Sequence, residues 1–187
     1  NNLFSTNGKE ALSYLQERGL KNDVIKQFRL GYSNNSWDQL VLHCKGKGFT
    51  KSQILKSGLF TQSEKGIFDR FRNRIMFPIF HSSGKPIAFG GRTLDKDEPA
   101  KYLNSPETPL YKKRNVLYGV HVARNAILKE KHVILVEGYM DFLKLYQSGI
   151  ESILALSGTA LTDTQVTAIS RMTQKIILFY DGDSAGG

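Results

Sequence analysis

The sequence predicts a combination of two fold classes, an N-terminal α+β region followed by an α/β region built on a parallel sheet. In the last third, short apolar stretches alternate with stretches of helical periodicity, which is the pattern of a βαβαβ unit. In the first sixty residues, by contrast, short helical patterns each end near a glycine. We place the boundary between residues 117 and 118, which gives an N-terminal subdomain of residues 1–117 and a C-terminal subdomain of residues 118–187.

The N-terminal subdomain is predicted to begin with four short helices. Apolar residues recur at helical spacing around residues 12–15, 24–28, 37–43 and 51–55. Two apolar runs then flank a glycine-containing turn, which indicates an antiparallel hairpin. They cover residues 74–80 and 87–89, and the polar segment 95–115 that follows is expected to be a connection without strands.

The C-terminal subdomain is predicted to hold three buried strands separated by helices. A helix over 122–128 precedes them, and the apolar runs 133–136, 153–156 and 176–180 are the strands. Residues 140–146 have helical spacing. Thr162 and Gln165 form a capping box that opens a helix ending near Met172. Solidly apolar strands of this kind indicate a parallel sheet covered on both faces.

The charge of the chain favours a polyanionic partner. Lysine and arginine exceed aspartate and glutamate by nine among 187 residues, which favours nucleic acid or an anionic membrane as the partner. No apolar run reaches the roughly 18 residues of a membrane span. The single cysteine, Cys44, excludes an internal disulfide and a cysteine-based zinc cluster within these residues, and a reducing cytoplasm is expected. Because the sequence lacks an initiator methionine, we expect it to be an excised piece.

Acidic residues follow two of the three predicted parallel strands. Glu137 comes directly after the first strand, and Asp181 and Asp183 come after the third. The carboxyl ends of parallel strands meet at one edge of a sheet, where ligands bind. Carboxylates gathered there would repel one another unless a cation joins them, and hard oxygen ligands suit Mg²⁺. The sequence therefore predicts a magnesium site of the kind used in phosphoryl chemistry, with Glu137, Asp181 and Asp183 as catalytic residues.

An acidic residue after a strand can also do no more than cap the next helix. For Glu137 alone this alternative stays open, whereas the combination with Asp181 and Asp183 favours the metal site. Asp141 lies four residues after Glu137, on the same face of the predicted helix. It is a candidate metal ligand or a group that supports one.

Several motifs resemble a known family. Glu137-Gly138-Tyr139-Met140-Asp141 and the segment 180–186 resemble the Toprim domain of primases, topoisomerases and some nucleases. Four upstream segments resemble the RNA polymerase core of bacterial DnaG-type primases. They are Tyr14-Leu15-x-x-Arg18-Gly19, Phe71–Ile79, Gly90-Gly91-Arg92 and, as the most specific of them, Lys101–Thr108. The resemblance runs from about residue 8 to the end of the chain.

The resemblance implies a DNA-dependent RNA polymerase that makes short RNA primers during DNA replication. It implies an N-terminal α+β subdomain and a partial Toprim subdomain with a βαβαβ parallel sheet. Metal ligands would be Glu137, Asp141, Asp181 and Asp183, holding Mg²⁺ or Mn²⁺. Arginines and lysines suit phosphate, and those expected to bind nucleic acid or triphosphate are Arg72, Arg74, Arg92, Lys101 and Lys113.

The same resemblance implies partners and segments outside this chain. The partners are a single-stranded DNA template, the RNA primer and ribonucleoside triphosphates. A replicative helicase in the primosome would bind through a C-terminal domain, and zinc would belong to an N-terminal domain. The chain ends at Gly187, where the family has a further helix and acidic strand end, so we do not expect this fragment to be active by itself.

Some residues are assigned less specific roles. The four histidines, at 43, 81, 121 and 132, show no metal-ligand spacing and are expected to be surface or packing residues. Tyr102 and Tyr111 are candidates for stacking on bases, and so is Trp37, for which packing in an aromatic core or against a linker is favoured.

Two other functions remain open from the sequence. One is a module that binds single-stranded DNA without catalysis, which magnesium-dependent incorporation of ribonucleotides would exclude. The other is a Toprim nuclease or topoisomerase. A topoisomerase needs a tyrosine that forms a covalent link to DNA, and nothing marks one of the eight tyrosines for that role.

Overall fold

The computed structural model describes residues 2–158 and 160–180. Contacts group the chain into two compact units, which are described separately. The first unit comprises Asn1–Arg18, Ile25–Pro78 and Ala88–Tyr111, and the second comprises Gly19–Val24, Ile79–Ile87 and Lys112–Gly187. The predicted boundary at residues 117 and 118 stays a prediction. Within the described residues, no helix is long and apolar enough to cross a membrane.

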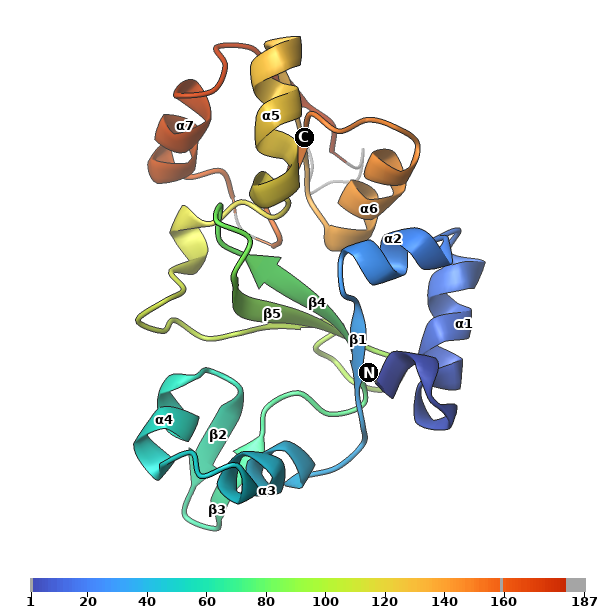
Figure 1. Ribbon diagram of the computed structural model, residues 1–187, viewed down its shortest axis with the longest axis vertical. Coiled ribbons are helices and arrows are strands. Elements are labelled where there is room, and N and C mark those ends of the chain that lie inside the picture. The colour runs from blue at the N-terminus through green and yellow to red at the C-terminus, as the bar shows by residue number, and fades with distance from the viewer. Residues whose placement is uncertain (1, 159, 181–187) are drawn as a thin grey trace. The chain divides into compact units, whose positions relative to one another are not determined.

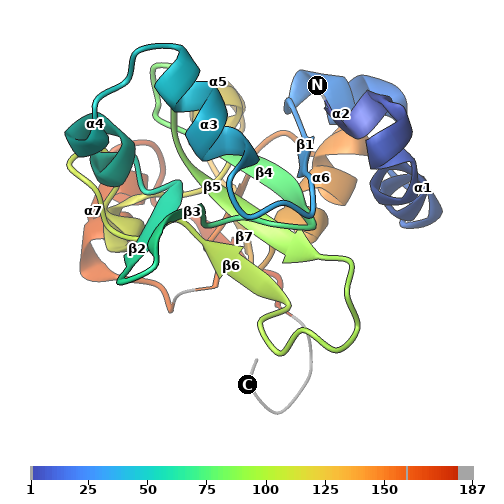
Figure 2. The ribbon, with the colours of Figure 1, turned by 90° about the horizontal axis from the view of Figure 1, so that it is seen from below.

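A four-stranded sheet provides the frame of the N-terminal half. Its strands, in the order β1-β4-β5-β6, are β1 (Gly31–Ser33), β4 (Arg74–Phe80), β5 (Pro86–Thr93) and β6 (Tyr102–Asn104). β4, β5 and β6 follow one another across the sheet (Figure 2). The two predicted strands 74–80 and 87–89 correspond to β4 and β5. The prediction that residues 95–115 lack strands was wrong, because β6 pairs antiparallel with β5, with Gly91 opposite Leu103.

The four predicted helices are present, as α1 (Lys9–Glu17), α2 (Asn22–Gln27), α3 (Gln39–Gly46) and α4 (Lys51–Lys56). α3 and α4 flank a two-stranded sheet of β2 (Phe60–Ser63) and β3 (Gly66–Asp69), which the sequence did not indicate (Figure 1). Val41, Ile54 and Phe60 form a small core between these elements. Thr50 caps α4 through a complete capping box with Gln53.

The second unit contains the predicted parallel sheet, in the order β8-β7-β9. Its strands are β7 (Val133–Val136), β8 (Ile153–Ala155) and β9 (Ile176–Leu178), and both neighbours pair parallel with β7. The helices are α5 (Val120–Glu130), α6 (Tyr139–Gln147) and α7 (Asp163–Ser170). Thr162 and Gln165 form the predicted capping box. The combined α+β and α/β fold class is therefore confirmed, with a three-stranded parallel sheet that fits a partial Toprim fold.

The core of this sheet lies against α5 and α7. Val133 and Leu135 of β7 pack with Ile127 of α5 and Ile169 of α7. α6 packs against β8 and buries Met140, Phe142 and Leu143. The expectation that all three strands are fully covered was wrong for β9, since the Leu178 side chain is 57% exposed among the described residues. Its run of apolar residues predicted a buried strand, but β9 is an edge strand of the described sheet.

Candidate functional site

Two of the predicted metal ligands line one cavity at the carboxyl end of β7. Glu137 follows the last residue of β7 directly and is exposed, and Asp141 lies in the first turn of α6. Both carboxylates border a cavity of about 170 Å³, together with Lys144, Leu145 and Phe179. Asp141 also accepts a hydrogen bond from the Gly138 amide at 3.2 Å, through Oδ2. Asp141 is thus a helix cap and a neighbour of Glu137 at once.

Two further segments reach the same edge of the sheet. The Ser157 amide, in the loop after β8, donates to the Glu137 carbonyl at 2.8 Å. The next residue in this loop, Gly158, accepts a hydrogen bond from Lys113 Nζ at 3.3 Å. The structure therefore ties Lys113, which was predicted to bind nucleic acid or triphosphate, to the loop beside Glu137.

The end of β9 approaches Glu137 as well. The Phe179 amide donates to the Leu135 carbonyl of β7 at 2.8 Å. Burial, and secondly the negative charge of Glu137, raise the pKa of the Tyr180 hydroxyl above its ordinary value. Asp181 and Asp183, which come next in the sequence, lie outside the described residues, so their convergence with Glu137 stays a prediction.

The described residues supply a donor set that fits a hard divalent cation. Mg²⁺ is typically held by one or two carboxylates, with waters and substrate phosphates completing its octahedron. Glu137 and Asp141 offer two carboxylates at one cavity, and the bond to Gly138 occupies only one oxygen of Asp141. Within residues 2–158 and 160–180, no group of three or more histidine, cysteine, aspartate and glutamate residues gathers around a point that could hold a metal ion. A complete cage would need donors from elsewhere.

Among the predicted basic residues of the first unit, Arg72 is held by an aromatic ring and a backbone carbonyl. Its guanidinium carbon lies 3.9 Å from the centre of the Trp37 ring, and its Nη1 donates to the Asp69 carbonyl. Trp37 is 61% exposed and also packs edge-on against Phe68 at 5.7 Å between ring centres. Of the two packing roles expected for Trp37, packing in an aromatic core was therefore wrong. The pair offers a flat aromatic surface beside a positive charge, which suits a base and a phosphate.

Arg74 differs from the other predicted basic residues because it is 5% exposed. Its Nη1 donates to the carbonyls of Gly91 and Ala100, at 3.3 and 2.8 Å, and its Nη2 lies 3.5 Å from the Glu98 carboxylate. Burial lowers the pKa of the Arg74 guanidinium. The negative charge of Glu98 raises this pKa, and the positive charges of Arg72 and Arg70 lower it further. These contacts indicate that Arg74 fastens β4 to the chain beyond β5.

Arg92 lies on β5, and Lys101 lies directly before β6, which pairs with β5. The Arg92 guanidinium carbon is 4.1 Å from the centre of the Tyr14 ring, and its Nη1 donates to the Thr93 carbonyl at 2.9 Å. The Lys101 carbonyl accepts from the Thr93 amide, and the Lys101 side chain is exposed. Arg92 is positioned by a ring and a carbonyl, as Arg72 is, so hydrogen bonding within the chain does not neutralise either charge.

Sequence reasoning missed two charged residues near these sites. Arg70 donates twice to the Asn104 carbonyl, at 3.3 and 3.1 Å, and its charge influences Arg74. Arg70, Arg72 and Arg74 occur at every second position, and this spacing was the signal that could have identified Arg70. Lys144 lines the cavity with Glu137 and Asp141, and its position three residues after Asp141 on a helix placed it on the same face.

The remaining predictions have mixed outcomes. Tyr102 is 40% exposed and stays a candidate for base stacking. Tyr111 is 2% exposed, so the suggestion that it stacks on bases was wrong. The ring of His121 packs on Phe80 at 4.4 Å, and His132 Nε2 lies 3.2 Å from Ser152 Oγ, which agrees with packing roles for these two histidines.

Comparison with known proteins identifies the family. Residues 1–124 match the family described as DNA primase catalytic core, N-terminal domain. The chain belongs to the DNA primase catalytic core family. Residues 134–187 match a second family, described as Toprim-like, which covers the parallel sheet and its carboxylates.

Relatives and solved structures agree with this assignment to the primase family. The chain is 44% identical to a DNA primase of Clostridium acetobutylicum over 177 residues, which is 95% of this chain and 29% of that protein. The RNA polymerase domain of Mycobacterium tuberculosis primase DnaG has a TM-score of 0.91 and 34% identity, covering 98% of this chain and 62% of that one. A DnaG primase catalytic domain bound to ssDNA has a TM-score of 0.90 and 37% identity, covering 99% and 58%. The chain thus spans about 30% of the length of the curated relatives that it matches.

Proposed function

We propose that this chain is the part of a DNA primase that joins ribonucleotides into short RNA primers on a single-stranded DNA template. The observation that carries the proposal is the cavity shared by Glu137 and Asp141, at the edge of a parallel sheet to which Lys113 is also tied. It occurs in a member of the primase core family. A relative of similar structure was solved with single-stranded DNA, which supports the choice of template.

In this proposal the carboxylates hold Mg²⁺ or Mn²⁺. Glu137 and Asp141 contribute from the described residues, and Asp181 and Asp183 are proposed to join them. A bound magnesium ion would supply activation of the attacking hydroxyl and stabilisation of the leaving phosphate oxygen. The capping bond from the Gly138 amide orients the Asp141 carboxylate at this cavity. Lys144, which lines the same cavity, reduces the repulsion between the two carboxylates.

The basic residues are proposed to hold the phosphates. Arg72, Arg92 and Lys101 are assigned to the template and primer, and Lys113 to the triphosphate. Arg72 and Arg92 are stacked on aromatic rings and bonded to carbonyls, which orients each guanidinium while leaving its charge available for phosphate. Because Arg74 is buried and fully engaged, its role is proposed to be support of this surface rather than direct contact.

The proposal extends to partners and segments outside this chain. A helicase-binding C-terminal domain and a zinc-binding N-terminal domain are proposed for the full-length protein. The RNA primer and ribonucleoside triphosphates are its other ligands, and the cytoplasm is its proposed location.

The test is primer synthesis by the full-length protein with Glu137→Ala or Asp181→Ala. Incorporation of labelled ribonucleotides should be lost in both variants, while single-stranded DNA binding should remain, because the basic residues are unchanged. Glu151→Ala, an exposed carboxylate just before β8, is the matched control and should retain synthesis. Normal synthesis by either site variant would refute the assignment. DNA cleavage without incorporation by the wild-type protein would favour a Toprim nuclease instead.

A further inference from the structure

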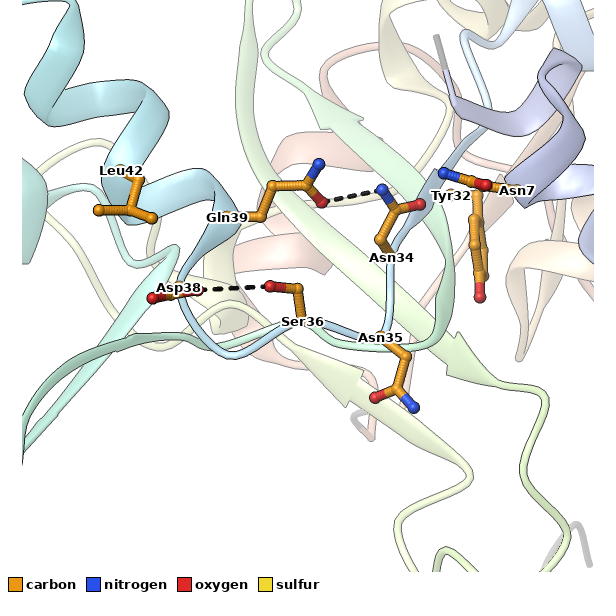
Figure 3. A pocket seen from close by; sticks show the side chains of 8 residues that line it. All are labelled: Asn7, Tyr32, Asn34, Asn35, Ser36, Asp38, Gln39 and Leu42. Carbon is orange, nitrogen blue, oxygen red and sulfur yellow. Dashed lines mark hydrogen bonds between the residues drawn. The ribbon is translucent and has the colours of Figure 1, made fainter.

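Two neighbouring cavities lie within the first unit. Their volumes are about 570 and 590 Å³, and Tyr32, Asn34 and Gln39 line both. Figure 3 shows the first cavity, between the start of α3 and the segment that follows β1. These three residues form a common wall, so a ligand in either cavity would meet the same side chains.

The lining of these cavities does not suit phosphate. The first cavity is lined mainly by uncharged polar side chains, including Asn7, Asn35 and Ser36, and the second adds the apolar side chains of Phe71, Met76 and Phe89. No lysine or arginine is among the described residues that line either one. A flat ring with a hydrogen-bonding edge fits this combination, because the ring meets apolar atoms and the edge meets amides.

The amide pair in the common wall has hydrogen-bonding capacity left over. Asn34 Nδ2 donates to Gln39 Oε1 at 2.8 Å, the bond drawn in Figure 3. Asn34 Oδ1 is buried and has no hydrogen-bond partner in the structure. A buried acceptor without a donor is unfavourable, and a small rotation of the amide would let a ligand N–H satisfy it. An amide oxygen beside an amide nitrogen is also the arrangement that pairs with the edge of a nucleobase.

Backbone hydrogen bonds tie this wall to the arginine-bearing segment. The Asp69 amide donates to the Trp37 carbonyl at 2.7 Å, and the Asn73 amide donates to the Asn34 carbonyl at 3.2 Å. The segment between these two amides carries Arg72, which stacks on Trp37. A strand whose phosphate is held by Arg72 would therefore lie close to Asp69 and Phe71, which line the second cavity.

We propose that the two cavities bind one unstacked base of the single-stranded DNA whose backbone Arg72 holds. The ring enters among Phe71, Met76 and Phe89, and its polar edge pairs with Asn34 and Gln39. This inference rests on the proposed function, since it assumes a DNA strand on this unit. Phosphate binding does not depend on the bases, whereas this contact requires a base at one position of the strand.

The test uses oligonucleotides about as long as one binding site, each with a single abasic nucleotide at a successive position. Loss of a base contact of this kind should weaken binding at one position by at least about fivefold. Met76→Trp fills the apolar cavity, and Gln39→Ala removes one amide from an exposed position at the start of α3. Both variants should bind the unmodified oligonucleotide more weakly than the wild type does. For the oligonucleotide that lacks the base at the sensitive position, the variants and the wild type should have equal affinity. Gln62→Ala, an exposed amide on β2, is the matched control and should behave as the wild type.

The outcomes separate this inference from the proposed function. An equal affinity for every abasic oligonucleotide, with binding and its salt dependence intact, would overturn the base pocket and leave the proposed function standing. A position-dependent loss that persists unchanged in both variants would also overturn it, since the base would then bind elsewhere. If the wild-type chain bound no single-stranded DNA even at low salt, the proposal for a template on this unit and the base pocket would fail together.

Discussion

The position of Arg72 gives a quantitative prediction for single-stranded DNA binding. Its guanidinium has a ring on one side and a backbone carbonyl as hydrogen-bond partner, so its charge is available to one phosphate. On single strands, each neutralised phosphate contributes about 0.7 to the slope of log affinity against log salt. Arg72→Ala should therefore lower that slope by about 0.7.

This slope can be turned into an affinity ratio. When salt rises fourfold, from about 50 to about 200 mM, the advantage of the wild type over Arg72→Ala should shrink by about 2.6-fold. Arg72→Lys keeps the charge, so the slope should stay as in the wild type. The flat stacking on Trp37 is lost in that variant, however, because an ammonium group has no planar face.

The assay is a titration of the chain with single-stranded DNA at several salt concentrations. Trp37 is the only tryptophan, so its fluorescence reports on this surface directly. Lys65→Ala, an exposed lysine in the turn between β2 and β3, is the control for a general change in net charge. An unchanged slope in Arg72→Ala would place Arg72 off the binding surface. An equal fall in Lys65→Ala would show that the effect is not specific to Arg72.

Three further predictions concern metal binding, packing and pH. Asp141→Asn should weaken Mn²⁺ binding, measured by the electron paramagnetic resonance of free Mn²⁺, while keeping the cap on Gly138; equal binding would remove Asp141 from the site. Gly119→Ala should destabilise the chain by about 2–5 kcal/mol, because its φ is +89° and a Cβ would overlap the Phe142 ring. Gly149→Ala, with φ of +94° and open space around it, should cost only about 1–2 kcal/mol, and equal melting temperatures would refute the packing argument. Burial, and secondly Glu107, raise the pKa of the Tyr111 hydroxyl to about 12. In the unfolded protein the Tyr111 hydroxyl loses its proton near pH 10, so the free energy of unfolding should fall as pH rises from 10 to 12. Urea unfolding should show a smaller fall for Tyr111→Phe, and an identical decline in both proteins would contradict this.

The elements with a strong local signal could be predicted from the sequence. The run Val133–Val136 is apolar at every position and is β7. The capping boxes at Thr50 and Thr162 are local too, since each is completed by a glutamine three residues later. Glu137 lies just before the N-cap of α6 and Asp141 lies in its first turn, so their shared cavity follows from residues that are close together in the sequence.

Elements that depend on distant partners could not be predicted in this way. β1 and β6 have only three residues each, and pairing with β4 and β5 makes them strands. The predicted helix beginning at Trp37 starts two residues later, because Asp69, distant in the sequence, accepts the amides of Leu40 and Val41 at 2.7 and 2.9 Å. Trp37 is left outside and exposed by this cap.

By itself, the sequence determined the order of strands and helices around the carboxylates, the excess of positive charge and the family motifs, since all of these depend on residues near one another in the chain. Tertiary structure alone decided which arginines have charges available to a ligand. Arg72 and Arg74 are two residues apart with the same side chain, yet one stacks on an exposed tryptophan and the other is buried against carbonyls of β5 and the chain before β6. The reason is that burial and hydrogen bonding are set by groups brought together from distant positions in the sequence, which local spacing does not specify.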